Sequence, residues 1–339
     1  MHHFESLFQE ESDLHIPEIV ESAGYFPTSI SVDDNSDLMI PVNLQEIQFI
    51  LSINKNDKNP GPDEIPVEVY RCIFYVLGED LLRVIDFSPI SGKIPAVFNS
   101  TFIALIPNND HPISFEYFRP ISLGNYIYKI LCKIISIQIR KVLGRCISRE
   151  QFGFLPGRQI HDDVGVIQEG IHTIHSKGLK SVMIKIDLSK AYDRFSWTYL
   201  RVILSKMGFA GNFISWVMSS LSFVSFALLI NGVASTFFKY GWGLRQGCPL
   251  APLVFLIVVE GLGRALLFSK DSGIYHGISF GNDIVLTHVM FVDDIVMIND
   301  GTEQSLSTLY EILLIFSKAS GMKINDDKYS LYSSCLEES

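Results

Sequence analysis

The stretch SVMIKIDLSKAYD, Ser181 to Asp193, decides the predicted fold because its side chains alternate with a period of two. One strand face would carry Val182, Ile184, Ile186 and Leu188, and the other would carry Ser181, Met183, Lys185 and Asp187. The first face is entirely apolar, so we expect it to lie against a core. Asp187 is then expected at the end of a half-buried strand, on the face opposite the core.

A second stretch, HVMFVDDIVMI from His288 to Ile298, places two adjacent carboxylates, Asp293 and Asp294, between two runs of strand formers. Aspartate is a common turn residue, so an ordinary hairpin is the simplest interpretation. Nucleotidyl transfer, however, needs two divalent cations about 3.5–4 Å apart, and Mg²⁺ prefers carboxylate oxygens. A single Asp187 at a strand end plus an Asp pair on a neighbouring hairpin would supply that ligand set.

The remaining sequence predicts helices and strands in an order typical of an α+β fold, an antiparallel sheet backed by helices. Helices are expected at residues 66–84, 126–144, 196–207, 211–221, 252–268 and 305–320. Strands are expected at residues 102–107 and 223–231, and as pairs within 286–298 and 323–332. The strand at 223–231 ends at Asn231-Gly232, a dipeptide that predicts a hairpin turn. Residues 1–45 are acidic and rich in turn formers, which predicts an irregular linker or arm. The uncharged stretch 214–230 predicts a buried helix followed by a strand rather than a membrane span.

Composition restricts the class of protein. With 339 residues, 47% of them hydrophobic, the chain is long enough for two or three packed units. A net charge of −10 argues against strong nonspecific binding of a polyanion by this chain alone. The five cysteines form no CxxC pair and are interpreted as reduced thiols. The N-terminus lacks a signal-peptide pattern, so an intracellular location is expected, nuclear or cytoplasmic, with no membrane partner.

Several motifs carry a resemblance to a known family. The FVDD sequence resembles the aromatic-x-Asp-Asp box of reverse transcriptases, and IDLSKAYDRFSW, Ile186 to Trp197, resembles their first palm box. Between them, GWGLRQGCPLAPLVFLIVVE, Gly241 to Glu260, is similar to the Arg-Gln-Gly-x-Pro-Leu-Ser-Pro box of non-LTR retrotransposon enzymes. Four more matches are NPGPDEIP, FRPISLGNYIYKI, QFGFLPGRQIHDDV and ASGMKINDDKYSL. The seven matches are in order across residues 54–331, so the chain resembles the reverse transcriptase domain of a non-LTR (LINE-type) retrotransposon polyprotein, plant-like.

The resemblance implies roles for particular residues. Asp187, Asp293 and Asp294 would hold two Mg²⁺ ions, with Mn²⁺ as an alternative metal and Asp294 as the weakest candidate for a direct ligand. The backbone carbonyl of Leu188 would complete a metal site. Lys328 matches the lysine proposed to protonate the leaving pyrophosphate; the alternative interpretation is a solvated surface lysine.

Four further residues are implied in nucleotide binding. Tyr192 matches the aromatic gate against a sugar 2′-hydroxyl, with a core tyrosine as the alternative. Arg119 matches an arginine that grips the triphosphate, with an exposed salt bridge as the alternative. Gln246 and Gly247 match the turn beside nucleotide and template, with a simple helix entry as the alternative.

The fold implied is the fingers and palm of a right-hand polymerase, with the thumb missing. Residues 1–53 would form an N-terminal arm or linker, 54–175 the fingers, and 176–339 the palm with fingers contributions, truncated before the thumb. The function implied is RNA-directed DNA polymerisation: in-line attack of a primer 3′-hydroxyl on a dNTP, with an RNA template and a DNA primer as partners. The oligomeric state stays open.

Two alternatives to this function remain. An RNA-templated RNA polymerase would share this palm arrangement, but it is disfavoured by Tyr192 and by the Arg245-Gln246-Gly247 sequence. A catalytically inactive remnant, or a passive nucleic-acid-binding module, is favoured by the acidity, by the ending at Ser339 and by Asn108, which stands where the family usually has lysine. Even if the chain is an enzyme, we expect it to be weak or inactive by itself.

Overall fold

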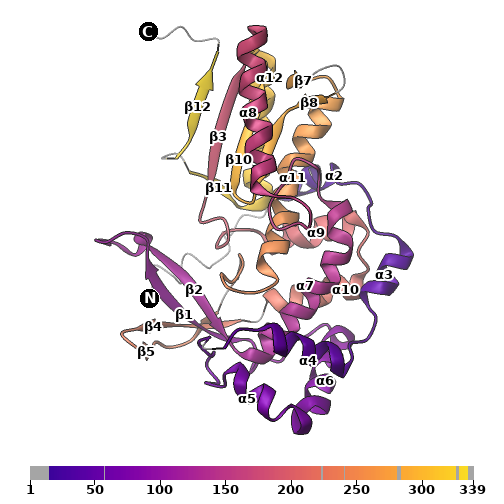
Figure 1. Ribbon diagram of the computed structural model, residues 1–339, viewed down its shortest axis with the longest axis vertical. Coiled ribbons are helices and arrows are strands. Elements are labelled where there is room, and N and C mark those ends of the chain that lie inside the picture. The colour runs from indigo at the N-terminus through magenta and orange to yellow at the C-terminus, as the bar shows by residue number, and fades with distance from the viewer. Residues whose placement is uncertain are drawn as a thin grey trace.

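The computed structural model describes residues 15–56, 58–222, 224–239, 241–280, 284–325 and 328–334, apart from the side chain of Glu116. The molecule is elongated, with one sheet and its flanking helices at one end and a largely helical region at the other (Figure 1). A second sheet projects from the middle of the molecule to one side. The mixture of helices and mainly antiparallel strands confirms an α+β fold.

The first sheet contains the two stretches that led the sequence prediction. Its strands are β3 (Val182–Ser189), β9 (His288–Phe291), β10 (Asp294–Asn299), β11 (Lys323–Ile324) and β12 (Ser330–Ser333). All of their pairings are antiparallel, with β3 between β10 and the short strands β11 and β12. The strand pair predicted within 286–298 is therefore confirmed. Two short strands are also found near 323–332, but each pairs with β3 rather than with the other. Residues 326 and 327 of this predicted pair lie outside the described part.

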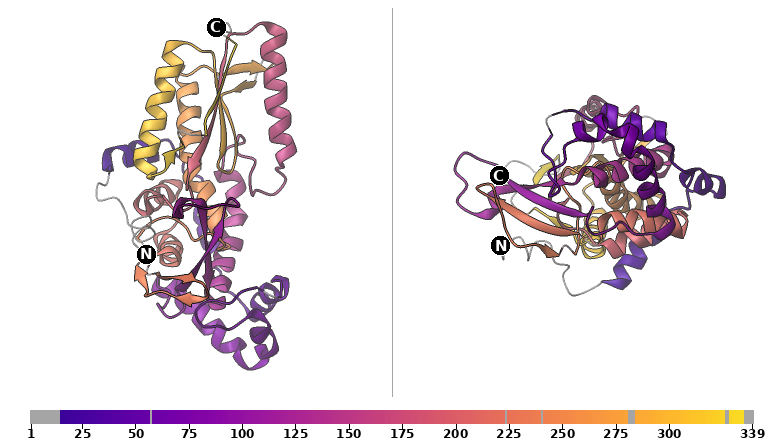
Figure 2. Two further views of the ribbon diagram at one scale, coloured as in Figure 1. Left: turned by 90° about the vertical axis from the view of Figure 1, so that its left-hand side faces the viewer. Right: turned by 90° about the horizontal axis from the view of Figure 1, so that it is seen from below.

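Helices cover both faces of this sheet. On one side lie α11 (Ala251–Asp271) and α12 (Glu303–Ser320), and on the other lies α8 (Ile160–Lys177), as Figure 2 shows in its left view. Ile186 and Leu188 pack into the main core, whereas Met183 packs in a separate cluster with Ile174 of α8. The prediction that one face of β3 lies opposite the core is thus wrong for Met183, whose side chain is only 6% exposed. Alternation shows which residues share a face, but not whether something covers it.

The second sheet joins distant parts of the chain. It contains β1 (Ser100–Pro107), β2 (Phe118–Gly124), β4 (Ser225–Ile230), β5 (Val233–Ala234) and β6 (Phe238–Lys239). The pairing of β1 with β2 is antiparallel, and that of β1 with β4 is parallel. The predicted hairpin at Asn231-Gly232 is confirmed, because both residues have positive φ, 51° and 82°.

The predicted helices are found with small differences. The structure has α5 (Val67–Cys72), α6 (Phe74–Ser91), α7 (Tyr126–Cys146), α9 (Trp197–Met207) and α10 (Gly211–Leu221). The single helix expected over residues 66–84 is broken at Ile73 into α5 and α6. The stretch 214–230 is a helix followed by a strand, as predicted.

The N-terminal region differs from the prediction. Three helices stand where an irregular linker or arm was expected: α2 (Ile16–Gly24), α3 (Val32–Leu38) and α4 (Leu44–Ile53). Residues 1–14 lie outside the described part. Ser31 and Asn43 each form a capping box at the start of a helix, which satisfies backbone N–H groups that would otherwise lack partners. The helix α2 packs on α9 and α12, and Ser22 Oγ lies 2.7 Å from the Tyr199 hydroxyl. Packing and capping therefore order a region whose composition resembles a linker.

The helix α11 forms the centre of the main core. It is the one described helix long and apolar enough to cross a membrane, but 78% of its apolar window is buried inside the protein. Such burial is typical of a core helix.

Cys132, Cys146 and Cys248 are buried free thiols and Cys72 is an exposed one, while Cys335 lies outside the described residues.

Candidate active site

The two predicted acidic strand ends meet in the first sheet. Asp294, the first residue of β10, is the register partner of Asp187 on β3. Directly opposed residues in an antiparallel pair have Cα atoms about 4.5–5.5 Å apart and side chains on the same face. Asp187 and Asp294 therefore lie side by side, as the prediction of converging carboxylates requires.

Asp293 lies in the tight turn that joins β9 to β10. Phe291 pairs with Asp294, so Val292 and Asp293 are the two turn residues. Val292 has a positive φ of 61° and Asp293 does not, which is the pattern of a type II′ turn. A branched side chain rarely adopts this backbone conformation, so the turn is strained at Val292.

The charge on Asp293 is destabilised by its surroundings. Burial raises its pKa above the usual value, and the like charges of Asp294 and Asp187 raise it further. The positive charge of Arg119, from β2, opposes this effect. Mutual repulsion among carboxylates is what a divalent cation relieves, so this donor set fits Mg²⁺ or Mn²⁺.

Lysines contact two of the three carboxylates. Lys185 Nζ lies 2.7 Å from Asp294 Oδ1, and Lys328 Nζ lies 3.6 Å from Asp187 Oδ2. Asn325 Nδ2 also donates to Asp187 Oδ2, at 3.3 Å. Within the described ranges, no three His, Cys, Asp or Glu side chains gather closely enough to hold a metal ion. A divalent cation bound here would compete with these two lysines for Asp187 and Asp294.

Lys328 has the exposure of a surface lysine and also contacts the acidic site. Its side chain is 70% exposed, as a solvated surface lysine would be. Its ammonium nevertheless lies beside Asp187, because the backbone N–H of Lys328 donates to the carbonyl of Asn325, and Asn325 N–H donates to the carbonyl of Asp187. The lysine is thus both exposed and in contact with Asp187.

Tyr192 packs against the main core. Its ring stacks on Phe255 of α11, with centroids 4.6 Å apart and planes 12° from parallel. The ring therefore packs as in the alternative interpretation, a core tyrosine, whereas a role as a sugar gate stays a prediction. Burial raises the pKa of its hydroxyl to about 12, and the charge of Asp293 adds to this shift. The residue thus packs on the core helix, and its hydroxyl is affected by the charge of the acidic turn.

The Gln246–Gly247 turn lies against β2 and the chain after β3. The Gln246 carbonyl accepts from Ser122 N–H at 2.9 Å, and its side-chain amide donates to both oxygens of Asp193 at 3.2 Å. Gly247 has φ of 96°, which favours glycine. Asp193 is 3% exposed, and burial raises its pKa to about 7. The sequence placed Asp193 in a motif but assigned it no role.

Two other residues near the acidic turn were missed. Lys185 was treated only as a strand residue, although it contacts Asp294. Asp163 on α8 is buried, and its pKa is raised by burial and by the charge of Asp294. A carboxylate at the start of a helix is common, so no sequence signal separated Asp163 from a helix-capping residue.

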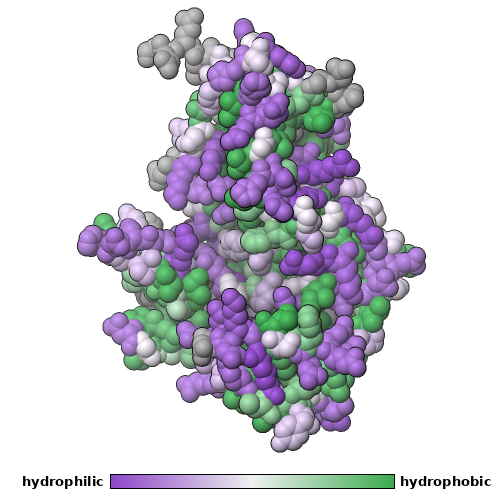
Figure 3. Space-filling model, viewed as in Figure 1, coloured by the Kyte–Doolittle hydropathy of each residue, from purple (hydrophilic) through white to green (hydrophobic). Residues whose placement is uncertain are grey.

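The other predicted residues are placed as follows. Arg119 is exposed on β2, opposite Ile106 of β1. On the face shown in Figure 3, the surface is hollowed between the end of the molecule that contains the first sheet and the projecting β1–β2 hairpin. The Leu188 side chain is buried, and its register partner is Ile324 of β11.

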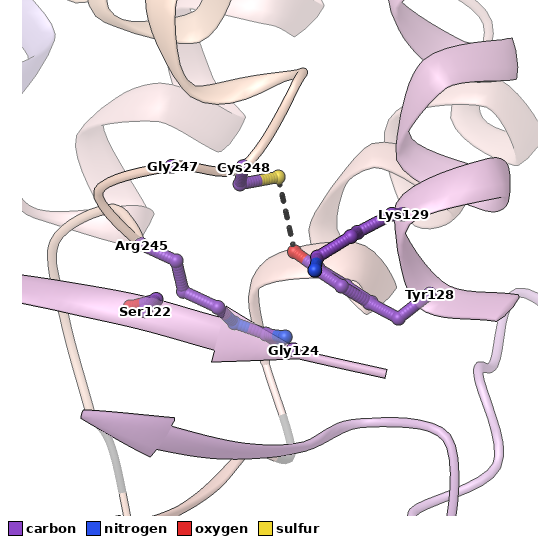
Figure 4. A pocket seen from close by; sticks show the side chains of 7 residues that line it. All are labelled: Ser122, Gly124, Tyr128, Lys129, Arg245, Gly247 and Cys248. Carbon is purple, nitrogen blue, oxygen red and sulfur yellow. Dashed lines mark hydrogen bonds between the residues drawn. The ribbon is translucent and has the colours of Figure 1, made fainter. Parts of the chain in front are cut away.

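A small pocket lies beside the Gln246–Gly247 turn (Figure 4). It is lined by Ser122, Gly124, Tyr128, Lys129, Arg245, Gly247 and Cys248. The Arg245 guanidinium lies 3.9 Å from the centroid of the Tyr128 ring. The pocket has room for about one water molecule, so it is too small for a nucleotide.

Comparisons with known proteins identify the family of this chain. A family model described as Reverse transcriptase (RNA-dependent DNA polymerase) matches residues 106–337. The chain is 27% identical over 293 residues to the Transposon TX1 uncharacterized 149 kDa protein of Xenopus laevis. The aligned region covers 86% of this chain and 22% of that protein. It is also 27% identical over 270 residues to the Retrovirus-related Pol polyprotein from type-2 retrotransposable element R2DM of Drosophila melanogaster, covering 80% and 24%.

The chain spans about a quarter of the length of these curated relatives. The predicted resemblance to non-LTR retrotransposon enzymes is confirmed by them, whereas the narrower plant-like assignment stays a prediction. Since the matching family model covers more than half of the 339 residues, the chain belongs to the reverse transcriptase (RNA-dependent DNA polymerase) family.

Proposed function

We propose that this chain is the fingers and palm of an RNA-directed DNA polymerase that extends a DNA primer on an RNA template. The observation that carries the proposal is the register pairing of Asp187 with Asp294, next to a turn that holds Asp293. Residues 54–175 would be the fingers and 176–339 the palm. The pairing of β1 with β4 supports a fingers contribution from the second segment.

The carboxylates would bind the metal ions, and Lys328 would act as a general acid. Asp187 and Asp293 would hold the metals, with Asp294 turned toward Lys185 and so the weakest candidate for a direct ligand. Two Mg²⁺ ions, when bound, would activate the primer 3′-hydroxyl and neutralise the charge that develops on the leaving group. Lys328, exposed and beside Asp187, would give a proton to the leaving pyrophosphate.

Residues around the acidic turn would select and hold the dNTP. Arg119 reaches the turn from β2 closely enough to affect the pKa of Asp293, which suits a triphosphate contact. Tyr192, fixed against Phe255, would exclude a ribose 2′-hydroxyl. Gly247 would let the backbone of its turn approach nucleotide and template. Such an enzyme would work on nucleic acid in the nucleus or cytoplasm.

The second candidate function is an inactive remnant or passive binding module. Asn108 favours it, because no lysine stands there to bind a triphosphate, and its backbone N–H donates to the Tyr117 carbonyl at 2.7 Å. The net charge of −10 favours it too. The grouping of Asp187, Asp293, Asp294 and Lys328 at one site favours the polymerase.

Primer extension with the purified chain, Mg²⁺, dNTPs and an RNA template at low ionic strength separates these two functions. Protein should exceed primer–template, so that weak duplex binding does not hide the chemistry. We expect extension by the native chain and none by Asp293→Asn. Asp271→Asn is the matched control, because Asp271 is an exposed acid that pairs only with Lys270 in the described structure. The polymerase proposal would be contradicted if the native chain and Asp293→Asn extended the primer equally, or if neither protein extended it.

A further inference from the structure

The segment around Gln151 runs beside the strand that leads into the acidic turn. Met290 N–H donates to the Glu150 carbonyl, and Phe152 N–H donates to the Met290 carbonyl, both at 2.8 Å. Gln151 and Met290 form an isolated parallel bridge. This pairing brings the Gln151 side chain to the turn that holds Asp293.

The Gln151 carboxamide oxygen bonds the turn directly. Gln151 Oε1 accepts from Val292 N–H at 3.0 Å and from Gly153 N–H at 2.9 Å. The side chain is only 1% exposed, and its Nε2 has no hydrogen-bond partner within the described part of the chain. In the described structure, the Gln151 side chain therefore makes its hydrogen bonds through Oε1, which acts as the acceptor. Val292 is the residue with the strained positive φ, so the bond holds the turn where it is strained.

Gly153 provides the space for this arrangement. A Cβ added at Gly153 would come 2.5 Å from Val292 Cγ2 and 3.0 Å from Val292 N. Any larger residue would push the turn away from Gln151. The close approach explains why glycine is needed at this position, although its φ is ordinary.

The Gln151 segment is itself fixed to the core. The Arg158 guanidinium donates to the backbone carbonyls of Ser148, Gln151 and Ile147. Ser148 in turn donates its backbone N–H and its hydroxyl to the buried Glu260 carboxylate on α11, at 2.9 and 3.0 Å. A continuous hydrogen-bonded path thus runs from the core helix to the acidic turn.

We propose that Gln151 is a positioning residue: its carboxamide oxygen holds the Val292–Asp293 turn in the conformation that keeps Asp293 beside Asp187. The consequence for catalysis rests on the proposed polymerase function, whereas the restraint on the turn does not.

Two substitutions at Gln151 separate the acceptor from the rest of the side chain. Gln151→Met keeps a similar length and volume but removes the strong acceptor. Gln151→Glu keeps an acceptor oxygen and replaces the Nε2 group, which lacks a partner in the described structure, with the second oxygen of a carboxyl group that burial favours in its neutral form. Gln138→Met is the matched control, because Gln138 is also buried but bonds Lys141 on its own helix α7.

The first measurement is hydrogen exchange of the Val292 amide, followed by mass spectrometry with fragmentation of the 288–295 peptide. We expect Gln151→Met to exchange about tenfold faster or more than the native chain, with Gln151→Glu and Gln138→Met close to native. Unchanged Val292 exchange in Gln151→Met would overturn the inference. So would equally fast exchange in Gln151→Glu. If Gln151→Met does not fold, Gly153→Ala decides: faster Val292 exchange supports the restraint, and native exchange overturns it.

The second measurement is single-turnover primer extension by the same proteins. We expect Gln151→Met to lose about tenfold or more in rate while the apparent dNTP affinity stays within about threefold, and Gln151→Glu to recover most of the rate. Native extension by Gln151→Met with fast Val292 exchange would overturn the positioning role. If no protein extends a primer but Gln151→Met exchanges faster, the polymerase proposal fails and the restraint on the turn stands.

Discussion

Asp187 and Asp294 are register partners across β3 and β10, and each contacts a different lysine. The pairing places two carboxylates on one face of the sheet, at the end where the strained Val292–Asp293 turn begins. The lysine contacts partly neutralise this acidic group in the absence of metal. The site thus combines an unfavourable charge cluster with groups that a cation or a nucleotide would displace.

Replacing Asp293 should abolish activity but stabilise the fold. Asp293→Asn removes a carboxylate whose pKa is raised by burial and by its acidic neighbours, so ionisation of Asp293 opposes folding at neutral pH. Without divalent metal at pH 7, we expect its melting temperature to rise by about 1–3 °C. Mg²⁺ should stabilise the native chain more than the variant. A lower melting temperature for the variant would contradict this prediction.

Asp193 should make stability depend on pH in a defined window. Its pKa is raised to about 7 by burial, whereas the same group in the unfolded chain ionises near 3.8. Stability from this residue is therefore lost as pH rises from about 4 to about 7, and the loss is constant above that. Asp193→Asn should melt higher than the native chain at pH 8 but not at pH 4. Melting curves at several pH values test this, and a difference that does not change with pH would refute it.

Lys328 should affect turnover far more than folding. Its contact with Asp187 is largely exposed, so Lys328→Met should change the melting temperature little. Loss of a general acid should lower the extension rate by roughly 10²-fold or more. Lys177→Met, an exposed lysine at the far end of α8, serves as the control. A native rate in Lys328→Met would show that the lysine is only a surface charge.

Tyr192 should determine sugar selectivity. Tyr192→Val removes the ring that stacks on Phe255, and the space it leaves would admit a ribose 2′-hydroxyl. We expect the ratio of kcat/KM for dNTP over rNTP to fall by about tenfold or more, whereas Tyr192→Phe keeps the ring and the selectivity. An unchanged ratio in Tyr192→Val would assign the tyrosine to packing alone.

Binding of primer–template should be weak and sensitive to salt. The chain carries 27 Lys and Arg against 37 Asp and Glu, so few phosphates of a duplex are neutralised at once. We therefore expect the dissociation constant to rise steeply between low and moderate salt, together with a loss of extension. Fluorescence anisotropy with a labelled duplex measures this. Tight, salt-tolerant binding would contradict the prediction.

The amino-acid sequence by itself determined most of the strands and helices, and it gave the residues that are expected to carry chemistry. Period-two alternation located β3, two runs of strand formers located the β9–β10 hairpin, and Asn231-Gly232 located a turn. These signals depend on neighbouring residues alone. The acidic turn was found in the same way. Residues 16–53 were misread, because composition does not reveal that α2 will pack on α9 and α12.

Only the tertiary structure decided how these segments meet. Strand register placed Asp187 beside Asp294, and packing placed the Tyr192 ring on Phe255. The bond from Gln151 to Val292 joins residues 141 positions apart in the chain. Alternation and motifs report which residues share a face or a turn, but the partner across a sheet or a core is set by long-range packing, which no local pattern encodes.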